Sequence, residues 1–196
     1  MNYTSSPLME RIRRCTLCEQ HLPLAPKPVL QAERNAKILI AAQAPGKLAH
    51  EAGRPFDDPS GDRLRRWLGV SHEQFYDPGL FALVPMGFCY PGTRAGGDLP
   101  PRPECAPTWR EELLEYLSQI KLTLVIGQYA QAYHLPNSER TLTERVGNWR
   151  KYWPAQLPLP HPSGRNNRWL AKNPWFEQEV IPALQIRVQE ILNNQS

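Results

Sequence analysis

The sequence predicts an α/β protein: a three-layer α/β/α sandwich around a central, mainly parallel four-stranded sheet. Short apolar runs alternate along the chain with segments that carry helix signals, and Gly or Pro follows most of the runs. Strands that alternate with helices favour a parallel sheet covered on both faces. A length of 196 residues suits a single domain, which we expect to span residues 1–196.

The first strand is expected at residues 37–41, a buried apolar run that ends before a Pro-Gly break. A helix should follow, with Ser60 as its N-cap and Gly69 at its end. Apolar residues recur there at helical spacing, namely Leu64, Trp67 and Leu68. The chain therefore begins as strand, loop and helix.

The second strand is expected at residues 80–84, and a long Pro- and Gly-rich excursion over residues 85–107 follows it. The next helix should open at Thr108, with Glu111 as its capping-box partner. A third strand at residues 122–126 leads into a helix over residues 128–133.

Leu157 and Leu159 mark a fourth strand, which nearby prolines confine to the edge of the sheet. The last helix should open at residues 173–174, run to residue 192 and be kinked by Pro182. Residues 1–36 form an N-terminal segment that carries a pair of cysteines, and we expect residues 193–196 to be a frayed tail.

The loops that follow the strands should share one edge of the sheet. They are residues 42–47, 85–105, 127 and 161–168. Open α/β sheets bind ligands in the crevice outside the carboxyl ends of their strands. Segments far apart in sequence are therefore expected to form one site.

Composition narrows the class of protein. The net charge of +4 and the pI near 9.0 are compatible with a polyanionic partner, although many proteins with no such partner share them. Residues 1–8 lack the apolar core of a signal peptide, and no run of about 18 apolar residues occurs. We expect a cytoplasmic protein without membrane contact, in which cysteines are metal ligands, catalytic groups or buried thiols rather than disulfides.

Residues 42–46 read Ala-Gln-Ala-Pro-Gly, and residues 53–61 read Gly-Arg-Pro-Phe-Asp-Asp-Pro-Ser-Gly. Glycine and proline fix a backbone that approaches a planar ligand closely, and Phe56 offers a stacking face. Both motifs, with the His-Pro-Ser at residues 161–163, resemble the uracil-DNA glycosylase superfamily. The pattern is most similar to its iron-sulfur-containing bacterial and archaeal branch.

The resemblance implies a pocket for an extruded base. His161 would donate to the carbonyl oxygen of the leaving base and stabilise its negative charge, and Phe56 would stack on it. The implied base-binding residues are Gln43, Ala44, Pro45, Gly46, Phe56 and Asn166.

Two departures from the family concern chemistry. The branch carries glutamate where this chain has Gln43, which cannot accept a proton, and Ala44 replaces the aspartate of the classical uracil enzymes. A carboxylate from Asp57 or Asp58 is the alternative source of water activation, as in another branch, although both residues equally suit a cap at the start of the helix.

The third departure concerns the base that is read. Relatives place a base-pairing asparagine four residues before the third cysteine, where this chain has Pro85. Proline offers no polar side chain and no N–H, so Asn166, Asn167 or Gln43 would have to read the base. A damaged base other than uracil is therefore an open alternative.

The region after His161 enters DNA in the family. The resemblance assigns DNA contacts to Ser163, Arg165, Asn167 and Arg168, and arginines there suit phosphate groups. A solvated basic turn, with Trp169 in the core, is the alternative.

Four cysteines match the ligand pattern of the iron-sulfur branch: Cys15, Cys18, Cys89 and Cys105. The resemblance implies a 4Fe-4S cluster that holds the N-terminal segment against the long loop. Zinc, which usually takes two short spacings, and thiols without metal are the alternatives.

Taken together, the sequence predicts a monofunctional DNA glycosylase that hydrolyses the N-glycosidic bond of uracil or another damaged or deaminated base in DNA repair. Its catalytic candidates are His161, Asp58, Asp57 and Gln43. DNA is the expected partner, and a monomer is expected. The alternatives are a catalytically silent DNA-binding or lesion-sensing member, or an iron-sulfur redox or scaffold protein.

Overall fold

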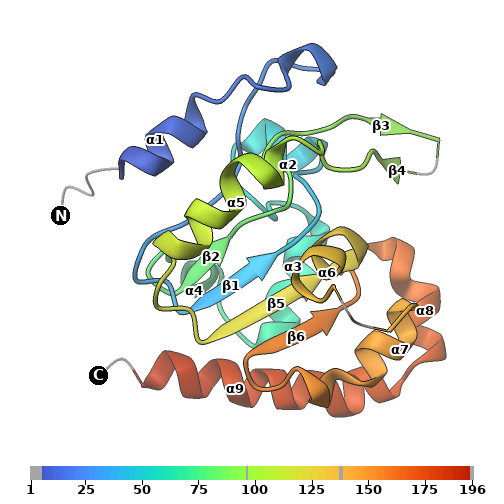
Figure 1. Cartoon of the computed structure of the whole chain (residues 1–196). Coiled ribbons are helices and arrows are strands. Elements are labelled where there is room, and N and C mark those ends of the chain that lie inside the picture. The colour runs from blue at the N-terminus through green and yellow to red at the C-terminus, as the bar shows by residue number, and fades with distance from the viewer. Residues whose placement is uncertain (1–5, 96, 137–138, 195–196) are drawn as a thin grey trace.

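The computed structural model describes residues 6–95, 97–136 and 139–194. A four-stranded parallel sheet with the order β2-β1-β5-β6 forms its centre (Figure 1). The strands are β1 (Ile38–Ala41), β2 (Phe81–Leu83), β5 (Leu122–Ile126) and β6 (Gln156–Leu159). Each pair is parallel and β6 lies at an edge, as predicted from its prolines.

Helices cover both faces of this sheet, which confirms the three-layer α/β/α class. They are α1 (Pro7–Arg13), α2 (Lys47–Ala52), α3 (Pro59–Leu68), α4 (His72–Phe75), α5 (Cys105–Tyr116), α6 (Gly127–His134), α7 (Leu142–Gly147), α8 (Asn167–Lys172) and α9 (Ile181–Asn193). Short 3₁₀ turns occupy Glu19–His21, Trp149–Lys151 and Gly164–Asn166, and a π-helical segment occupies Phe176–Val180.

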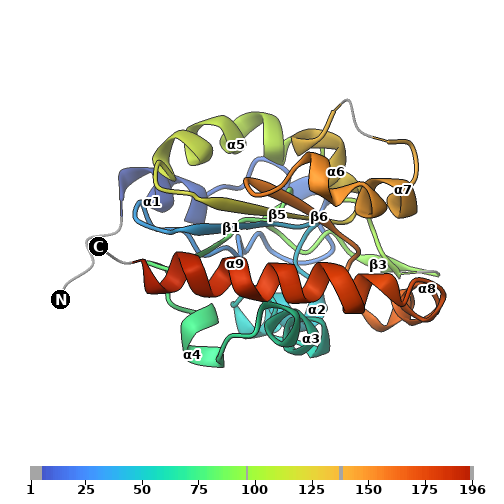
Figure 2. The ribbon, with the colours of Figure 1, turned by 90° about the horizontal axis from the view of Figure 1, so that it is seen from below.

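Alternation along β1 divides the core between the two faces. Ile38 and Ile40 pack with α3, α4 and α9 on one face. Leu39 packs with α1 and α5 on the other face, and Ala41 packs there with α6. Figure 2 shows the same division, with α5 and α6 on one side of the sheet and α3, α4 and α9 on the other. Residues buried on both faces explain why the strand is apolar throughout.

The start of α3 differs from the prediction. Asp58, not Ser60, is the N-cap, and its Oδ1 accepts a hydrogen bond of 2.9 Å from the Gly61 N–H. Pro59 takes the first helical position, because its fixed φ suits a helix and it has no N–H to satisfy. The end of the helix is as predicted, since Gly69 adopts the left-handed conformation with φ 67°.

Two later helices differ from the prediction. Helix α5 starts at Cys105, three residues before Thr108, whose hydroxyl donates back to the Glu104 carbonyl oxygen at 2.7 Å instead of capping the helix. The last helix opens close to the predicted position and runs to residue 193, but it is not α-helical throughout. A π-helical segment at Phe176–Val180 leads without a break into α9, and Pro182, which has no N–H to donate, lies directly after that segment.

The long excursion after β2 contains an antiparallel hairpin that the sequence did not predict. It consists of β3 (Thr93–Arg94) and β4 (Gly97–Asp98), and it projects past the carboxyl ends of the main strands (Figure 1). Of the predicted tail, residue 193 ends α9, and residues 195–196 lie outside the described chain. Within the described residues, no helix is long and apolar enough to cross a membrane.

Candidate active site

A cavity of about 430 Å³ lies at the carboxyl edge of the sheet, where the loops after β1, β2, β5 and β6 meet. A volume of this size is ordinary for a site that encloses a small ligand. Its lining from these four loops comprises Ala42, Gln43, Ala44, Pro45, Gly46, Pro85, Gln128, Tyr129, His161, Ser163, Arg165 and Asn166. Residues from α2, the loop before α3, α3 and the hairpin complete the wall: Ala49, Pro55, Phe56, Asp58, Ser60 and Asp98.

His161 follows β6 and is held from both sides. Its Nδ1 accepts a hydrogen bond of 3.2 Å from the Ser163 N–H, and its carbonyl oxygen accepts one of 2.7 Å from Asn166 Nδ2. Burial lowers the pKa of His161, and Arg165 lowers it further against the opposing effects of Asp58 and Asp98. A neutral imidazole that accepts at Nδ1 carries its proton on Nε2, so this ring presents a donor to a ligand.

Phe56 faces the same cavity from the opposite loop. Its ring centroid lies 6.5 Å from that of His161, with 27° between the two planes. The backbone of Phe56 has a φ of 57°, which is uncommon for a residue with a side chain. Helix α3 explains how this conformation is held: a Cβ on Gly61 would lie 1.8 Å from the Phe56 carbonyl oxygen. The loop packs directly on glycine at the first turn of α3.

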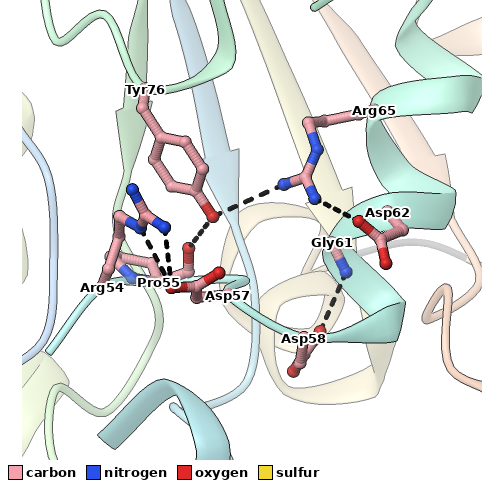
Figure 3. A network of polar contacts seen from close by, with 8 residues as sticks. All are labelled: Arg54, Pro55, Asp57, Asp58, Gly61, Asp62, Arg65 and Tyr76. Atoms are coloured by element: carbon pink, nitrogen blue, oxygen red, sulfur yellow. Dashed lines mark hydrogen bonds and ion pairs between the residues drawn. The ribbon is translucent and has the colours of Figure 1, made fainter. Parts of the chain in front are cut away.

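A polar network fixes the loop that carries Phe56 (Figure 3). Arg54 binds Asp57 Oδ2 at 2.8 Å, and the guanidinium lies over the Tyr76 ring at 4.4 Å. The Tyr76 hydroxyl donates to the Pro55 carbonyl oxygen at 3.0 Å, and Arg65 approaches that hydroxyl at 3.4 Å. These contacts tie the loop to the end of α4 and to α3, so that the aromatic ring has a fixed support.

The two adjacent aspartates have different surroundings. Asp57 is paired with Arg54 and does not line the cavity. Asp58 caps α3, as one of its two interpretations expected, and it also lines the cavity.

Gln43 lines the cavity, but its amide nitrogen is committed to the backbone. Nε2 donates to the Leu99 carbonyl oxygen at 3.1 Å, which fastens the hairpin to the loop after β1. The residues that follow it, Ala44, Pro45 and Gly46, also line the cavity. The structure therefore brings the whole first motif to the site.

Pro85, at the position where the resemblance led us to expect an asparagine, lines the cavity. A fully buried Arg110 on α5 supports this point, because its Nη1 donates to the carbonyl oxygens of Val84 and Pro85 at 3.0 Å each. Burial lowers the pKa of Arg110 to about 10, and the guanidinium also contacts His134 Nε2 at 2.7 Å. A positive charge thus lies behind this wall of the cavity.

The candidate DNA-contacting residues separate into two groups. Ser163 and Arg165 line the cavity together with Asn166, whereas Asn167 and Arg168 are exposed on α8 outside it. Trp169 packs against Phe176 of the core with ring centroids 5.7 Å apart, as the alternative interpretation expected.

Among the lining residues that were not site candidates from the sequence are Gln128, Tyr129 and Asp98. Gln128 and Tyr129 begin α6 directly after β5, so the rule that ligands bind at strand ends would have found them. Asp98 carried no local signal, because only the hairpin brings it to the cavity.

The four cysteines are free and line one small cavity beside Pro28 and Arg102. They come from the N-terminal segment, the loop after β2 and the start of α5. Burial raises the pKa of Cys89 to about 11 and that of Cys105 to about 12. Among the described residues, no group of three or more His, Cys, Asp or Glu side chains has the arrangement of a metal site. The structure thus gathers the thiols without forming a defined coordination sphere.

The sequence of this chain is similar to those of known proteins. The family model described as the uracil DNA glycosylase superfamily matches residues 30–185. A type-4 uracil-DNA glycosylase of Thermotoga maritima is 25% identical over 172 residues, which cover 82% of this chain and 84% of the relative. The solution NMR structure of a candidate uracil DNA glycosylase from Methanosarcina acetivorans is 16% identical, with a TM-score of 0.48 and coverage of 82% and 98%. Since the family match spans most of the sequence, the chain belongs to the uracil DNA glycosylase superfamily.

Proposed function

We propose that this protein is a monofunctional DNA glycosylase that hydrolyses the N-glycosidic bond of uracil or another damaged base. The observation that carries the proposal is the cavity in which Phe56 and His161 face each other as near-parallel rings. The similarity to a relative described as a type-4 uracil-DNA glycosylase supports uracil as the first base to test. Glycosylases act on bases taken out of the duplex, which a recessed pocket with a stacking ring accommodates.

In this proposal His161 stabilises the leaving base. Cleavage of the bond leaves the electron pair on the base, and the developing negative charge falls on its ring nitrogen and carbonyl oxygen. A neutral imidazole whose Nε2–H points to that oxygen lowers the barrier electrostatically. The buried Arg110 behind Pro85 favours the same negative charge. DNA would approach along Arg165, Asn167 and Arg168, with arginines pairing with phosphates.

The test is cleavage of oligonucleotides that carry uracil, hypoxanthine, xanthine or an oxidised pyrimidine, with abasic sites counted after alkali treatment. His161→Ala should slow cleavage by about 100-fold or more, because one such donor contributes roughly 3 kcal/mol. The matched control is His72→Ala, an exposed histidine on α4. Cleavage at full rate by His161→Ala would contradict the mechanism.

A second candidate function is supported by one feature of the first motif. The Gln43 amide is engaged with the Leu99 carbonyl oxygen and has no proton-accepting group, which suits a silent member that binds lesions without cutting. Tight binding to lesion-bearing DNA without cleavage of any of these substrates would favour this lesion sensor over the enzyme.

We propose that the cysteine cavity holds a 4Fe-4S cluster. Four free thiols around one cavity fit the donors that such a cluster takes, and a cluster there would fasten the N-terminal segment to the loop after β2 and to α5. Its role in this proposal is structural. Iron and acid-labile sulfide should be found in protein purified without oxygen, and zinc or no metal would contradict the assignment.

A further inference from the structure

The proposed hydrolysis needs a group that accepts a proton from water, and the first motif does not supply it. An amide such as Gln43 does not take a proton at neutral pH. Asp57 is paired with Arg54 outside the cavity lining. Of the residues that the structure describes, two carboxylates line the cavity: Asp58, which caps α3, and Asp98, at the end of the hairpin.

Asp98 is exposed at the end of the hairpin and is held by one side-chain hydrogen bond and by the backbone bonds of the next residue. Its Oδ1 accepts a hydrogen bond of 3.2 Å from Thr93 Oγ1, its cross-strand partner. The next residue, Leu99, is fixed through both backbone groups: its N–H donates to the Gly92 carbonyl oxygen at 2.8 Å, and its own carbonyl accepts from Gln43. The hairpin end is therefore tied to the first motif rather than free to swing.

The last motif holds the same hairpin from its other side. Gly97 has a φ of 130°, and a Cβ there would overlap the Arg165 guanidinium, with 1.4 Å to Nη1. Only glycine allows Arg165 to lie this close to the strand that carries Asp98. Two loops far apart in sequence, those of Gln43 and Arg165, thus converge on one short segment.

The second oxygen of Asp98 lies beside the first motif. Oδ2 would lie 3.5 Å from a Cβ on Gly46, which itself lines the cavity. His161 is close enough that the charge of Asp98 acts on the pKa of its imidazole and raises it, against the dominant effect of burial. A carboxylate, Asp98, and a hydrogen-bond donor, His161, therefore line the same cavity. This pair suits a reaction that leaves positive charge on the sugar and negative charge on the base.

We propose that Asp98 is the catalytic carboxylate of this site, accepting the proton of the attacking water and facing the cationic sugar. The inference rests on the proposed function. The bond between the base and the anomeric carbon breaks, and its electron pair leaves on the base beside His161. The water oxygen then forms the new bond to the anomeric carbon, and the water proton passes to Asp98. That proton returns to solvent or to the base, so the net reaction is hydrolysis. Gln43 is a positioning residue that holds Asp98 through Leu99.

The test uses Asp98→Asn, whose carbonyl oxygen still accepts the Thr93 hydroxyl. The control is Glu112→Gln, an acid on α5 whose side chain is 45% exposed and paired with Arg11. Single-turnover cleavage of uracil- and hypoxanthine-containing oligonucleotides should fall by about 100-fold or more in Asp98→Asn, as expected for loss of a general base. It should remain at the wild-type rate in Glu112→Gln.

A binding measurement tests the same carboxylate without relying on turnover. Duplexes carry either a pyrrolidine abasic analogue, positive where the anomeric carbon would be, or a neutral tetrahydrofuran abasic analogue. The wild type and Glu112→Gln should bind the cationic duplex at least about 10-fold more tightly than the neutral one, and Asp98→Asn should bind both alike. Asp58→Asn distinguishes the charge of Asp58 from that of Asp98, because asparagine removes the charge but still caps α3. This variant should keep the preference for the cationic duplex.

The outcomes distinguish the two proposals. A wild type that cleaves no substrate, but prefers the cationic duplex through Asp98, would contradict the hydrolytic function and the role of Asp98 as proton acceptor, and it would support only the position of Asp98 beside the sugar. The assignment is overturned by a wild type with no preference, by Asp98→Asn retaining both preference and cleavage, or by loss of the preference in Asp58→Asn alone.

Discussion

Gly61 is the position at which a single methyl group tests how the Phe56 loop is held. Its added Cβ would lie 1.8 Å from the Phe56 carbonyl oxygen and 2.8 Å from the carbonyl carbon. Helix propensity alone predicts that Gly61→Ala stabilises α3 by about 1 kcal/mol. The clash predicts the opposite sign, because forcing a group into a packed site costs about 1–3 kcal/mol.

We therefore expect Gly61→Ala to lower the free energy of unfolding, by an amount that urea titration and thermal melting can resolve. Gly147→Ala is the matched control in α7, since its nearest heavy atom would be the Trp175 ring at 4.0 Å. This control should be neutral or slightly stabilising. A protein of this size shifts its melting temperature by roughly 2–4 °C per kcal/mol.

Gly61→Ala should also lose cleavage, because the carbonyl cannot retreat without moving the Phe56 ring. A displacement of about 1 Å in a positioned group can cost about 100-fold in rate. Activity is measured on the best substrate of the wild type, at a temperature well below the melting point of the variant. A Gly61→Ala protein that melts at or above the wild type and keeps its rate would refute the argument that this contact sets the loop.

Three further predictions concern the groups around the site. Burial and, to a smaller extent, Arg110 lower the pKa of His134 to about 3 in the folded protein. The unfolded chain therefore takes up a proton on this histidine below about pH 6.5, whereas the folded chain does not. The free energy of unfolding should fall by up to about 1.4 kcal/mol per pH unit below about pH 6.5. Urea titrations of His134→Gln should show a weaker dependence on pH, and an equal dependence in both proteins would contradict the low pKa of His134. Gln43→Glu should lower the melting temperature more than Gln43→Met, because it sets a carboxylate against the Leu99 carbonyl oxygen; the reverse order would refute this contact. Cys105→Ser should remove bound iron and speed proteolysis of residues 6–36, and unchanged cleavage there would argue against a cluster that fastens this segment.

The sheet could be predicted from sequence because its strands are short apolar runs closed by glycine or proline. Residues such as Ile38 and Leu39 are buried on opposite faces, which requires an apolar side chain at every position. The parallel order then followed from the alternation with helices, and with it the edge at which the loops meet. Short apolar runs and the residues that follow them were therefore enough to predict the sheet and the edge that carries the site.

Helix starts were less predictable, because several adjacent residues carry the same signal. Residues 57–60 read Asp-Asp-Pro-Ser, and three of the four are common caps. Pro59 decides among them, since it belongs in the first turn and places the cap one residue earlier, at Asp58. A cap is thus chosen by the neighbouring residue as much as by its own side chain.

Asp98 shows what local sequence signals cannot supply. Its position depends on a two-residue strand pair, on a left-handed glycine before it, and on Arg165, which lies 67 positions further along the chain. None of these features can be recognised from periodicity or from a motif in the sequence, whereas His161 and Phe56 lie in recognisable motifs. The motifs determine where the rings of Phe56 and His161 lie, but the carboxylate can come from any loop that contacts both motifs. In this chain that loop is the hairpin, which contacts Gln43 and Arg165.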